Sequence, residues 1–401
     1  MMQANGNIKE TFLRYVCQTS AEPLGIVVAR ASGSEIWDAE GRRYLDLLAG
    51  MGVANIGHCH PEVVRAIQAQ VEAYLHVAVY GEVAQRPQVE LARRLAEIAP
   101  GDLSVVYFAN SGAEAVEGAL KTARKFTGRP GLVGFHGAFH GDTFGALSLG
   151  GNPVYQQPFE PLLPQIERLP FDDLGVLNKI DSSTAAVIVE PIQGEGGVRI
   201  PGRTFLPALR QRCSEVGALL IADEVLTGFG RTGKLFACEH WQVTPDILVL
   251  AKALGGGMPL GGFVGSRAVM DTLSHDPPLA HVTTFGGHPV SCAAGLAALE
   301  VLLAERLPER AATVGAHWLE ELGSIAVRAD CAVRGKGLLM ALEFQTPEAT
   351  RRFVTGCFQR GLILNWTLHR DTVVRLAPPL TITEGEIRHV NAVMAEVFAL
   401  A

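Results

Sequence analysis

The chain has 401 residues, of which 48% are apolar and 19% are charged, and its formal net charge is −7. This composition suits a large folded core and excludes a disordered or fibrous chain. The negative charge offers no basic surface for nucleic acid, so we expect no nucleic-acid partner.

The first third of the chain mixes short strands with helices. The stretch EIWDAEGRRYLDL places a turn at residues 38–41 between two strand-like pieces. In the stretch HPEVVRAIQAQVEAYL, Pro61 occupies a plausible first helical position, and Val63, Ile67 and Val71 recur at helical spacing. We therefore expect a pair of strands followed by an amphipathic helix.

Six short apolar runs alternate with helical patterns from about residue 103 to residue 265. Val, Ile and Leu fill many of their positions, which is typical of strands buried on both faces of a mostly parallel sheet. The runs are LSVVYFAN, GLVGF, AAVIVEP, ALLIADE, DILVLAKA and GGFVGS. They predict a large α/β domain with helices on both sides of the sheet.

The pattern changes from about residue 291. Long helices rich in Ala and Leu come first, followed by the strand-like run LLMALEF, a helix, and the strand-like runs LILNW and VVRLAPP. A final helix is opened by a capping box of Thr383 and Glu386. These elements predict a smaller α+β domain. We divide the chain into an N-terminal segment 1–60 that joins the small domain, a large domain 61–290 and a C-terminal small domain 291–401.

Other features of the sequence bear on the compartment. The N-terminal stretch MMQANGNIKETF lacks the apolar segment of a secretory signal, and the chain has no run of about 18 uninterrupted apolar residues. The seven cysteines are scattered without C-x-x-C pairs, which is typical of a reduced protein. We expect a cytoplasmic location and no membrane partner.

The stretch TGFGRTGKL at residues 227–235 matches two nucleotide-binding patterns, G-x-G-x-x-G and most of a P-loop. Both patterns need the glycine loop directly after a strand, with helix N-terminal amides facing an anion. Here Asp223 and Glu224 stand between the strand and the loop, where they would repel a polyphosphate. Leu235 also occupies the position where a P-loop carries Ser or Thr for Mg²⁺. We interpret both matches as coincidental.

Chemically active side chains stand at the ends of three of the apolar runs. ALLIAD ends in Asp223, DILVLAK ends in Lys252, and SVVYFAN ends at Asn110, where SGAEA opens a helix. Because ligands of open α/β sheets bind at the carboxyl ends of strands, we expect these groups at one edge of the sheet. A lysine buried there must be neutralised, paired or used covalently.

This set of groups suits pyridoxal phosphate. The aldehyde of this cofactor reacts with a lysine of lowered pKa, and a carboxylate keeps its ring nitrogen protonated so that the ring accepts electrons. A helix N-terminus with small residues suits its phosphate. Phe139, in the stretch AFHGDTFG, offers an aromatic face for the ring.

Nearly the whole chain resembles the class III pyridoxal-phosphate-dependent aminotransferases, the ornithine, acetylornithine and 4-aminobutyrate type of fold type I. The resemblance rests on NSGAEA, FHGDTFGALS, VEPIQGEGGV, LIADEVLTGFGRTGKLFACEH, PDILVLAKALGGGMPLGG and TTFGGHP. It implies a large domain with a mostly parallel sheet, a smaller α+β domain and a homodimer with shared active sites. It also implies that the glycine loop positions Asp223 and binds no nucleotide.

The resemblance also implies roles for individual residues. Lys252 would join the cofactor covalently and carry the reacting proton, Asp223 would pair with the ring nitrogen, and Glu190 would order the network around them. Thr284 would reach the phosphate held by the neighbouring subunit. The implied cofactor-binding set is Ser111, Gly112, Ala113, Phe139, His140, Asp223, Val225, Lys252 and Thr284.

Glu195 and Arg375 are the pair that bears on the substrates. In family members that use glutamate and 2-oxoglutarate, the equivalent arginine holds the α-carboxylate, and the glutamate masks the arginine when an ω-amino donor is bound. A guanidinium is well suited to a carboxylate, and an internal ion pair hides its charge when no carboxylate is present. The resemblance therefore implies 2-oxoglutarate and glutamate as one substrate couple.

The chain departs from the family pattern near the expected donor site. Asp142, in HGDT, replaces an arginine that family members acting on ornithine or acetylornithine usually carry, and Met51 stands where free-ornithine enzymes have a tyrosine. These two residues complete the substrate-binding candidates. The reversed charge favours an amine or a neutral substrate end. Ornithine and acetylornithine therefore become weaker candidates than a diamine, lysine or another ω-amine.

The sequence as a whole predicts an aminotransferase of amino-acid metabolism that works by a ping-pong mechanism. The amino group would come from an ω-amine of a diamine or amino acid, such as acetylornithine, ornithine, lysine or 4-aminobutyrate, and pass to 2-oxoglutarate. An aminomutase or an ω-amine:pyruvate aminotransferase of the same fold stays open, as does a non-catalytic protein that binds the cofactor.

Simpler interpretations stay open for some of these residues. Glu195 and Arg375 could form a structural ion pair, and Asp142 could face solvent without contacting a substrate. The segment 58–60, His-Cys-His, is too closely spaced for its side chains to hold one tetrahedral ion. We expect no metal site and interpret this segment as a loop that caps the helix at Pro61.

Overall fold

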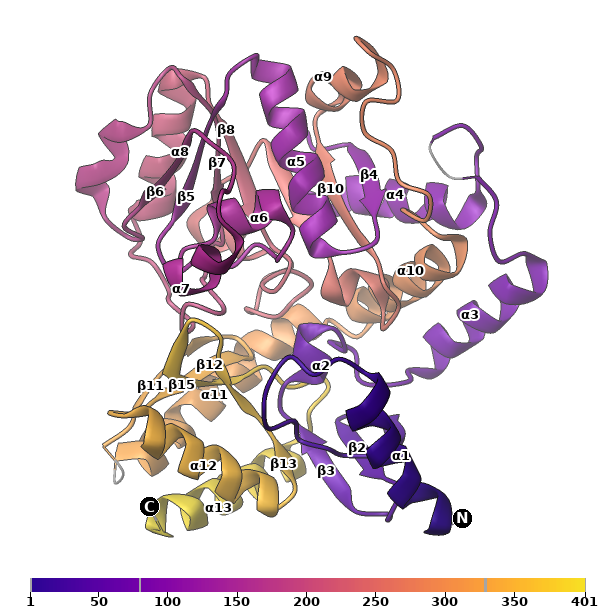
Figure 1. The fold of residues 1–401 in the computed structure, drawn as a ribbon, viewed down its shortest axis with the longest axis vertical. Helices are drawn as coiled ribbons and strands as arrows, with labels where there is room; N and C mark the ends of the chain where they lie inside the picture. The colour runs from indigo at the N-terminus through magenta and orange to yellow at the C-terminus, as the bar shows by residue number, and fades with distance from the viewer. Residues whose placement is uncertain (1, 79–80, 328–329, 401) are drawn as a thin grey trace.

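The computed structural model describes residues 2–78, 81–327 and 330–400. They form one seven-stranded sheet and two four-stranded sheets. In Figure 1 the large sheet and its helices occupy the upper half of the molecule, and both ends of the chain lie in the lower half. The candidate functional site takes its residues from the large sheet and its loops and from one hairpin of the lower half.

The large sheet has the strand order β4-β10-β9-β8-β7-β5-β6. Only β10 is antiparallel to its neighbours, so the prediction of a mostly parallel sheet is confirmed. Its strands are β4 (Val105–Ala109), β5 (Gly131–Phe135), β6 (Ile166–Leu169), β7 (Thr184–Val189), β8 (Leu219–Asp223), β9 (Ile247–Leu250) and β10 (Gly261–Gly265). Each of the six predicted runs contains a strand, whereas β6, with the sequence IERL, carries too few apolar residues to have been predicted.

Helices cover both faces of the large sheet, and alternate residues of the strands pack on alternate faces. On β8, Ile221 packs in the cluster that contains Val116 of helix α5 (Gly112–Thr127). The preceding Leu220 packs in the cluster that contains Phe205 of helix α8 (Phe205–Val216). All residues of β7, β8 and β9 are buried, which explains their nearly continuous apolar sequences.

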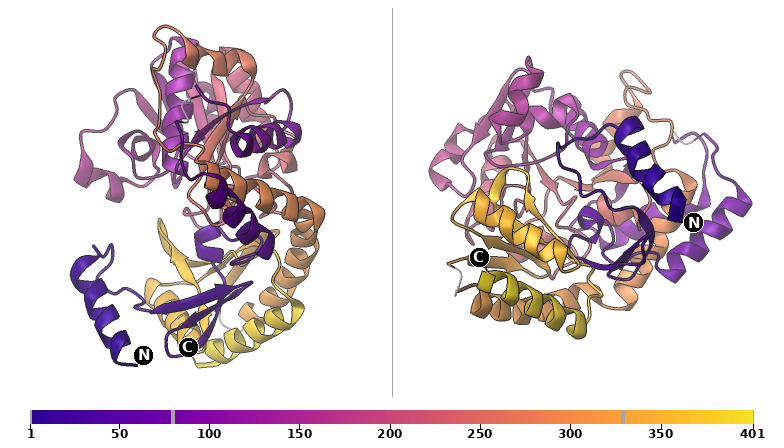
Figure 2. Two further views of the ribbon diagram at one scale, coloured as in Figure 1. Left: turned by 90° about the vertical axis from the view of Figure 1, so that its right-hand side faces the viewer. Right: turned by 60° about the horizontal axis from the view of Figure 1, so that its bottom comes forward.

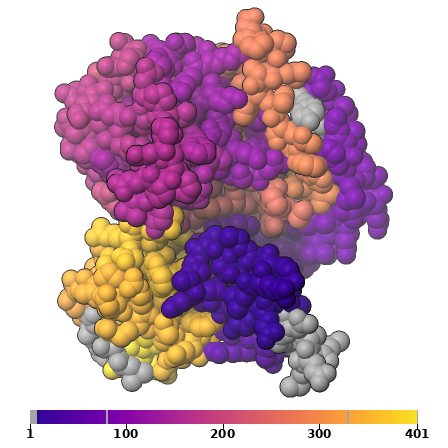
Figure 3. All heavy atoms as spheres, in the orientation of Figure 1, coloured from indigo at the N-terminus to yellow at the C-terminus, as the bar shows by residue number. Residues whose placement is uncertain are grey.

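The two ends of the chain share a second sheet, with the order β1-β2-β3-β13. Strand β13 lies parallel to β3, and Leu362 stands opposite Leu45. In Figure 3 the N-terminal and C-terminal segments adjoin in the lower half of the molecule. The strands are β1 (Val28–Ser32), β2 (Glu35–Asp38), β3 (Arg43–Asp46) and β13 (Leu362–Ile363). The division of the chain at residues 60 and 290 stays a prediction.

The third sheet is antiparallel, with the order β11-β12-β15-β14. Helices α11, α12 and α13 pack around it and bury Trp318, Phe353 and Met394 in a shared core. The predicted run LILNW is wrong as a single strand, because its halves enter two different sheets as β13 and β14. The elements are β11 (Ala332–Lys336), β12 (Leu339–Glu343), β14 (Asn365–Thr367), β15 (Arg370–Leu376), α11 (Leu307–Ala326), α12 (Pro347–Gln359) and α13 (Glu384–Leu400).

Two predicted helix starts are confirmed. Helix α3 begins at Pro61, and the ring Nδ1 of His60 accepts the backbone N–H of Glu62 at 3.3 Å. Before α13, the backbone N–H of Thr383 donates to Glu386 Oε2 at 2.6 Å, and the N–H of Glu386 donates to Thr383 Oγ1 at 3.2 Å. Each start satisfies backbone donors that a helix N-terminus leaves unpaired.

The other helical segments lie before, between and after the strands, and Figure 2 shows the molecule from two further sides. They are α1 (Met2–Tyr15), α2 (Ala49–Gly52), α3 (Pro61–Ala73), α4 (Arg86–Ile98), α6 (Phe144–Leu149), α7 (Pro153–Gln156), α9 (Arg267–Met270) and α10 (Pro289–Ala304). Short 3₁₀ turns are η1 (Gln157–Phe159), η2 (Leu174–Lys179), η3 (Ala237–Trp241), η4 (Lys252–Gly255) and η5 (Asp271–Ser274). None of the helices in the described residues is long and apolar enough to cross a membrane.

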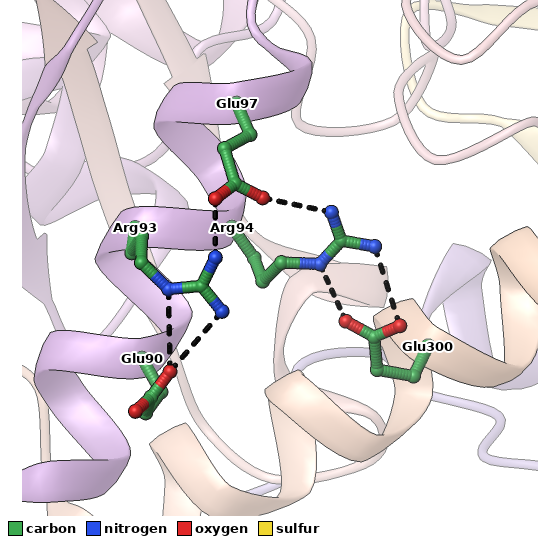
Figure 4. Close-up of polar contacts among 5 residues, drawn as sticks. All are labelled: Glu90, Arg93, Arg94, Glu97 and Glu300. Carbon is green, nitrogen blue, oxygen red and sulfur yellow. Dashed lines mark hydrogen bonds and ion pairs between the residues drawn. The ribbon is translucent and has the colours of Figure 1, made fainter.

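Figure 4 shows ion pairs on the surface of α4, one of which, between Arg94 and Glu300, joins α4 to α10. Arg94 Nε of α4 lies 2.6 Å from Glu300 Oε1 of α10, and Arg94 Nη1 lies 2.9 Å from Glu97 Oε2. Exposed pairs of this kind add little stability. The two helices are therefore held together chiefly by buried residues of their shared core, which include Leu95 and Leu299.

Candidate functional site

Three strand ends meet at one edge of the large sheet. Strands β4, β8 and β9 run in the same direction, because β10 is antiparallel to both β4 and β9. Asn110, Asp223 and Lys252 therefore lie around one cavity of about 430 Å³. The predicted residues that line it are Ser111, Gly112, Ala113, Phe139, His140, Glu190, Glu195, Asp223, Val225 and Lys252.

The N-terminus of α5 forms one wall of the cavity. Ser111 is its N-cap residue, with φ −147° and ψ 167°, and its hydroxyl accepts the backbone N–H of Glu114 at 3.1 Å. At Gly112 a Cβ atom would come within 3.1 Å of a Val225 methyl group, so only a residue without a side chain fits comfortably. A helix N-terminus lined by small residues is suited to an anion such as a phosphate.

Asp223 is buried beneath the cavity and held from two sides. Its Oδ2 lies 2.7 Å from His140 Nδ1, and its Oδ1 accepts the backbone N–H of Val225 at 3.1 Å. Burial opposes protonation of His140, but the hydrogen bond and charge of Asp223 prevail and raise the pKa of the imidazole. The other ring nitrogen, Nε2, is buried and has no hydrogen-bond partner within the described residues.

Glu190 fixes the two loops that border the cavity. Its Oε2 accepts the backbone N–H of Phe139, and its Oε1 accepts that of Gly194, both at 3.0 Å. Burial raises the pKa of this carboxyl to about 7. Because one side chain holds both loops, Glu190 sets the spacing between Phe139 and Glu195 across the cavity. A direct part of Glu190 in chemistry stays a prediction.

Lys252 is the second residue after β9, at the start of η4, and has an unusual backbone conformation. Its φ is +48°, in the left-handed region that residues with a side chain rarely adopt. Desolvation, followed by the positive charge of Arg375, lowers the pKa of its ammonium group. Strained backbone and a lowered lysine pKa in one cavity are features that cluster at catalytic sites.

Glu195 and Arg375 form an ion pair beside Lys252. Arg375 Nη1 donates to Glu195 Oε1, and the backbone N–H of Leu368 donates to Glu195 Oε2 at 2.8 Å. Burial acts against ionisation of Glu195, but the charge of Arg375 and these hydrogen bonds hold its pKa below the ordinary value. Arg375 is only 3% exposed. In this state the carboxylate covers the guanidinium, and the part that the pair plays with substrates stays a prediction.

Four predicted residues do not line the cavity of the single chain, and Arg375, which lies behind Glu195, is one of them. Asp142 is exposed in the loop before α6, where its charge acts on the ring of His369. Met51 is 48% exposed and lies in α2, with φ +67°. Thr284 is exposed in the loop before α10, and the neighbouring Thr283 Oγ1 accepts an N–H of the Asn110 side chain at 3.0 Å. Their assigned roles stay predictions.

Some residues of the site escaped sequence reasoning. Val53, Met258 and Leu260 are further apolar residues of the cavity wall. Met258 stands in the same motif as Lys252, so the motif itself was a usable signal. Leu368 bonds Glu195 from 173 positions away, and nothing in the local sequence around it indicates this contact.

Comparison with known proteins gives consistent matches. The family model described as "Aminotransferase class-III" matches residues 16–398. An acetylornithine aminotransferase from Methanopyrus kandleri is 46% identical over 374 residues, which cover 92% of this chain and 94% of that protein. A putrescine aminotransferase from Pectobacterium atrosepticum is 44% identical over 388 residues, which cover 93% of this chain and 82% of that protein.

The fold comparison agrees with these matches. The crystal structure of an ornithine aminotransferase from Toxoplasma gondii superposes with a TM-score of 0.91 at 34% identity. The superposition covers 99% of this chain and 95% of that chain. The chain therefore belongs to the class-III aminotransferase family, whose members transfer amino groups with pyridoxal phosphate as the cofactor.

Proposed function

We propose that the protein moves an amino group from an ω-amine donor to 2-oxoglutarate in two half-reactions at this cavity. The observation that carries the proposal is the Glu195–Arg375 ion pair beside Lys252. An arginine that an internal carboxylate can cover or uncover suits an enzyme that accepts two substrates of different charge in turn.

The groups around the cavity fit pyridoxal phosphate. The amine of Lys252 can hold its aldehyde, Asp223 can hold its ring nitrogen, and the N-terminus of α5 can hold its phosphate. The ring Nε2 of His140, which has no hydrogen-bond partner among the residues that the structure describes, leaves one polar atom for a group in the cavity. When bound, the protonated cofactor ring supplies an electron sink for the carbon that loses its proton.

Lys252 is the residue suited to move that proton. The lowered pKa increases the neutral fraction of the Lys252 amine, and a neutral amine can take a proton from the substrate carbon and return it. Asp223 holds the proton on the ring nitrogen, and the hydrogen bond from His140 keeps the carboxylate oriented. Glu190 keeps Phe139 at the cavity wall through its backbone N–H.

Arg375 is the residue suited to the acceptor. Its guanidinium can bind a carboxylate of 2-oxoglutarate through two parallel hydrogen bonds once Glu195 has withdrawn. With an ω-amine donor in place, Glu195 covers the charge again, so that no cation is left unpaired in a buried site.

Arg375→Ala should impair the 2-oxoglutarate half-reaction much more than the amine half-reaction. Loss of a charged hydrogen bond costs about 1.5–3 kcal/mol, or roughly ten- to one-hundredfold in rate. Single-turnover measurement of each half-reaction checks this, with Arg351→Ala on the exposed face of α12 as the control. An equal loss in both half-reactions would remove Arg375 from acceptor recognition.

The acceptor and donor can be identified in one set of assays. The purified enzyme is given N-acetylornithine, putrescine, ornithine, lysine or 4-aminobutyrate as donor, with 2-oxoglutarate or pyruvate as acceptor. Formation of glutamate supports the proposal. Formation of alanine alone would favour the ω-amine:pyruvate alternative, and isomerisation of an amine without any oxo acid would favour an aminomutase.

Asp142→Arg should shift donor preference toward donors that carry a carboxylate. A positive charge at this exposed position would attract a carboxylate, whereas the native carboxylate attracts an ammonium group. The ratio of kcat/KM for N-acetylornithine to that for putrescine should rise by about fivefold, the scale of an exposed charge pair. Asp102→Arg, on a distant exposed turn, is the matched control. An unchanged ratio would show that Asp142 does not contact the donor.

We further propose a cytoplasmic homodimer in which Thr284 reaches the cavity of the other subunit. Apolar side chains are exposed on one connected face: Phe285 packs on the ring of His76, and Val89 and Val282 line one groove. Their exposed fractions lie between 49% and 54%, and such a face is typical of an interface. The seven cysteines, all within the described residues, form no disulfides.

A further inference from the structure

The turn between β14 and β15 holds Glu195 at both ends. Leu368 and His369 form this two-residue turn. The N–H of Leu368 donates to the side-chain Oε2 of Glu195 at 2.8 Å, and the N–H of His369 donates to its backbone oxygen at 3.1 Å. Two successive N–H groups of one turn therefore fix both the backbone and the carboxylate of the residue that covers Arg375.

The same hairpin carries Arg375. On β15 this arginine stands opposite Asn365 of β14. The carboxylate of Glu195 therefore bonds two parts of the hairpin. It accepts one hydrogen bond from Arg375 on strand β15 and one from the N–H of Leu368 in the turn. If the whole carboxylate withdraws from Arg375, it must also give up the N–H of Leu368. The turn therefore adds to the energy needed to uncover the arginine.

Tyr155 and Gly137, which lie between β5 and β6 in the chain, hold this turn in position. The hydroxyl of Tyr155, in α7, donates to the carbonyl of Leu368 at 2.8 Å. The ring Nδ1 of His369 lies 3.3 Å from the carbonyl of Gly137, and the rings of His369 and Tyr155 lie 5.3 Å apart. Tyr155 and Gly137 therefore hold the turn against the segment 137–155. The same segment contributes Phe139 to the cavity wall.

We propose that Tyr155 and the Leu368–His369 turn form a latch that sets how readily Glu195 leaves Arg375. Tyr155 is a positioning residue, since its hydroxyl acts on Glu195 only through the turn. The proposal rests on the proposed function, in which Arg375 is covered for the amine and uncovered for the oxo acid. A weaker latch favours the uncovered state, so it strengthens binding of a dicarboxylate and slows the amine half-reaction.

Tyr155→Phe tests the latch because it removes one hydroxyl and keeps the ring. The dissociation constant of glutarate, a dicarboxylate without an oxo group, is measured by calorimetry on the cofactor-loaded enzyme, and the two half-reaction rates are measured separately. We expect glutarate to bind roughly two- to fivefold more tightly and the amine half-reaction to slow by a similar factor, as for one partly exposed hydrogen bond. The control is Tyr44→Phe, which removes a hydroxyl bonded to Asp38 in the N-terminal sheet.

A second variant acts on the bond to Glu195 itself. Leu368→Pro removes the N–H that donates to the carboxylate. We expect glutarate to bind roughly tenfold more tightly and the amine half-reaction to slow roughly tenfold, because that bond is charge-assisted. Weaker glutarate binding, or an equal change of both half-reactions in Tyr155→Phe, would overturn the latch. If Leu368→Pro does not fold, Tyr155→Phe decides alone.

The latch and the proposed function can fail separately. If the wild-type enzyme forms no glutamate from 2-oxoglutarate, the proposed acceptor is wrong, while tighter glutarate binding in Tyr155→Phe would still support the latch. If glutamate is formed and the variant binds glutarate as the wild type does, the latch is wrong and the acceptor stands.

Discussion

Lys252→Ala should abolish amino-group transfer, with a rate lower by at least about 10²–10⁴-fold, the usual contribution of a positioned general acid–base group. The lysine lies in the cavity with a lowered pKa, close to the charges of Asp223 and Glu195. No other lysine of the described residues lines this cavity. Amino-group transfer is followed as glutamate formation, with Lys234→Ala, on a neighbouring exposed turn, as the matched control.

A second measurement separates loss of the proton carrier from loss of the fold. Borohydride reduction followed by peptide mass analysis should fix the cofactor on the peptide that contains Lys252 in the wild type and in Lys234→Ala. The Lys252→Ala protein should carry no such adduct while keeping its melting temperature. An adduct on a different lysine, or full activity of Lys252→Ala, would mean that the cofactor is attached elsewhere.

Arg231→Met should lower the free energy of unfolding by about 3–5 kcal/mol, because three buried acceptors lose their donor. Arg231 is 0% exposed, and its guanidinium bonds Asn55 Oδ1 at 2.6 Å, the carbonyl of Leu338 at 3.0 Å and the carbonyl of Pro378. Met roughly preserves the volume but leaves these three acceptors unpaired, at about 1–3 kcal/mol each for full burial. Burial lowers the pKa of the guanidinium to about 9, so it stays protonated at neutral pH.

Denaturant unfolding of both proteins, followed by circular dichroism, measures this difference. Arg388→Met, on the exposed side of α13, is the control and should change stability by less than about 0.5 kcal/mol. The partners of Arg231 come from the N-terminal and C-terminal parts of the chain. If the free energy of unfolding falls by under about 1 kcal/mol, other contacts hold these parts together. A loss of stability in Arg231→Met would also assign a structural role to the glycine loop at 227–235, which contains Arg231.

Much of the fold, and the meeting of Asp223 and Lys252 at one cavity, could be predicted from the sequence because both are encoded locally. A strand buried on both faces needs a continuous apolar run, and a group that follows such a run, like Asp223 or Lys252, must lie at the edge of the sheet. The short strand β6 escaped prediction because its sequence IERL lacks that signature.

The contacts of Glu195 were harder to predict because they join distant parts of the chain. Glu195 meets a turn 173 positions away through a backbone N–H, and any residue except proline can supply such a donor. No side-chain type therefore marks Leu368. Met51 and Asp142 were singled out only as departures from a family pattern, and neither lines the cavity of the single chain.

The parallel pairing of β13 with β3 has a consequence for synthesis of the protein. Leu45 emerges from the ribosome more than three hundred residues before its partner Leu362. Until then β3 keeps an unpaired edge, which is prone to pair with other chains. Because such distant contacts form slowly, the edge of β3 stays open to wrong pairing for most of the synthesis of the chain.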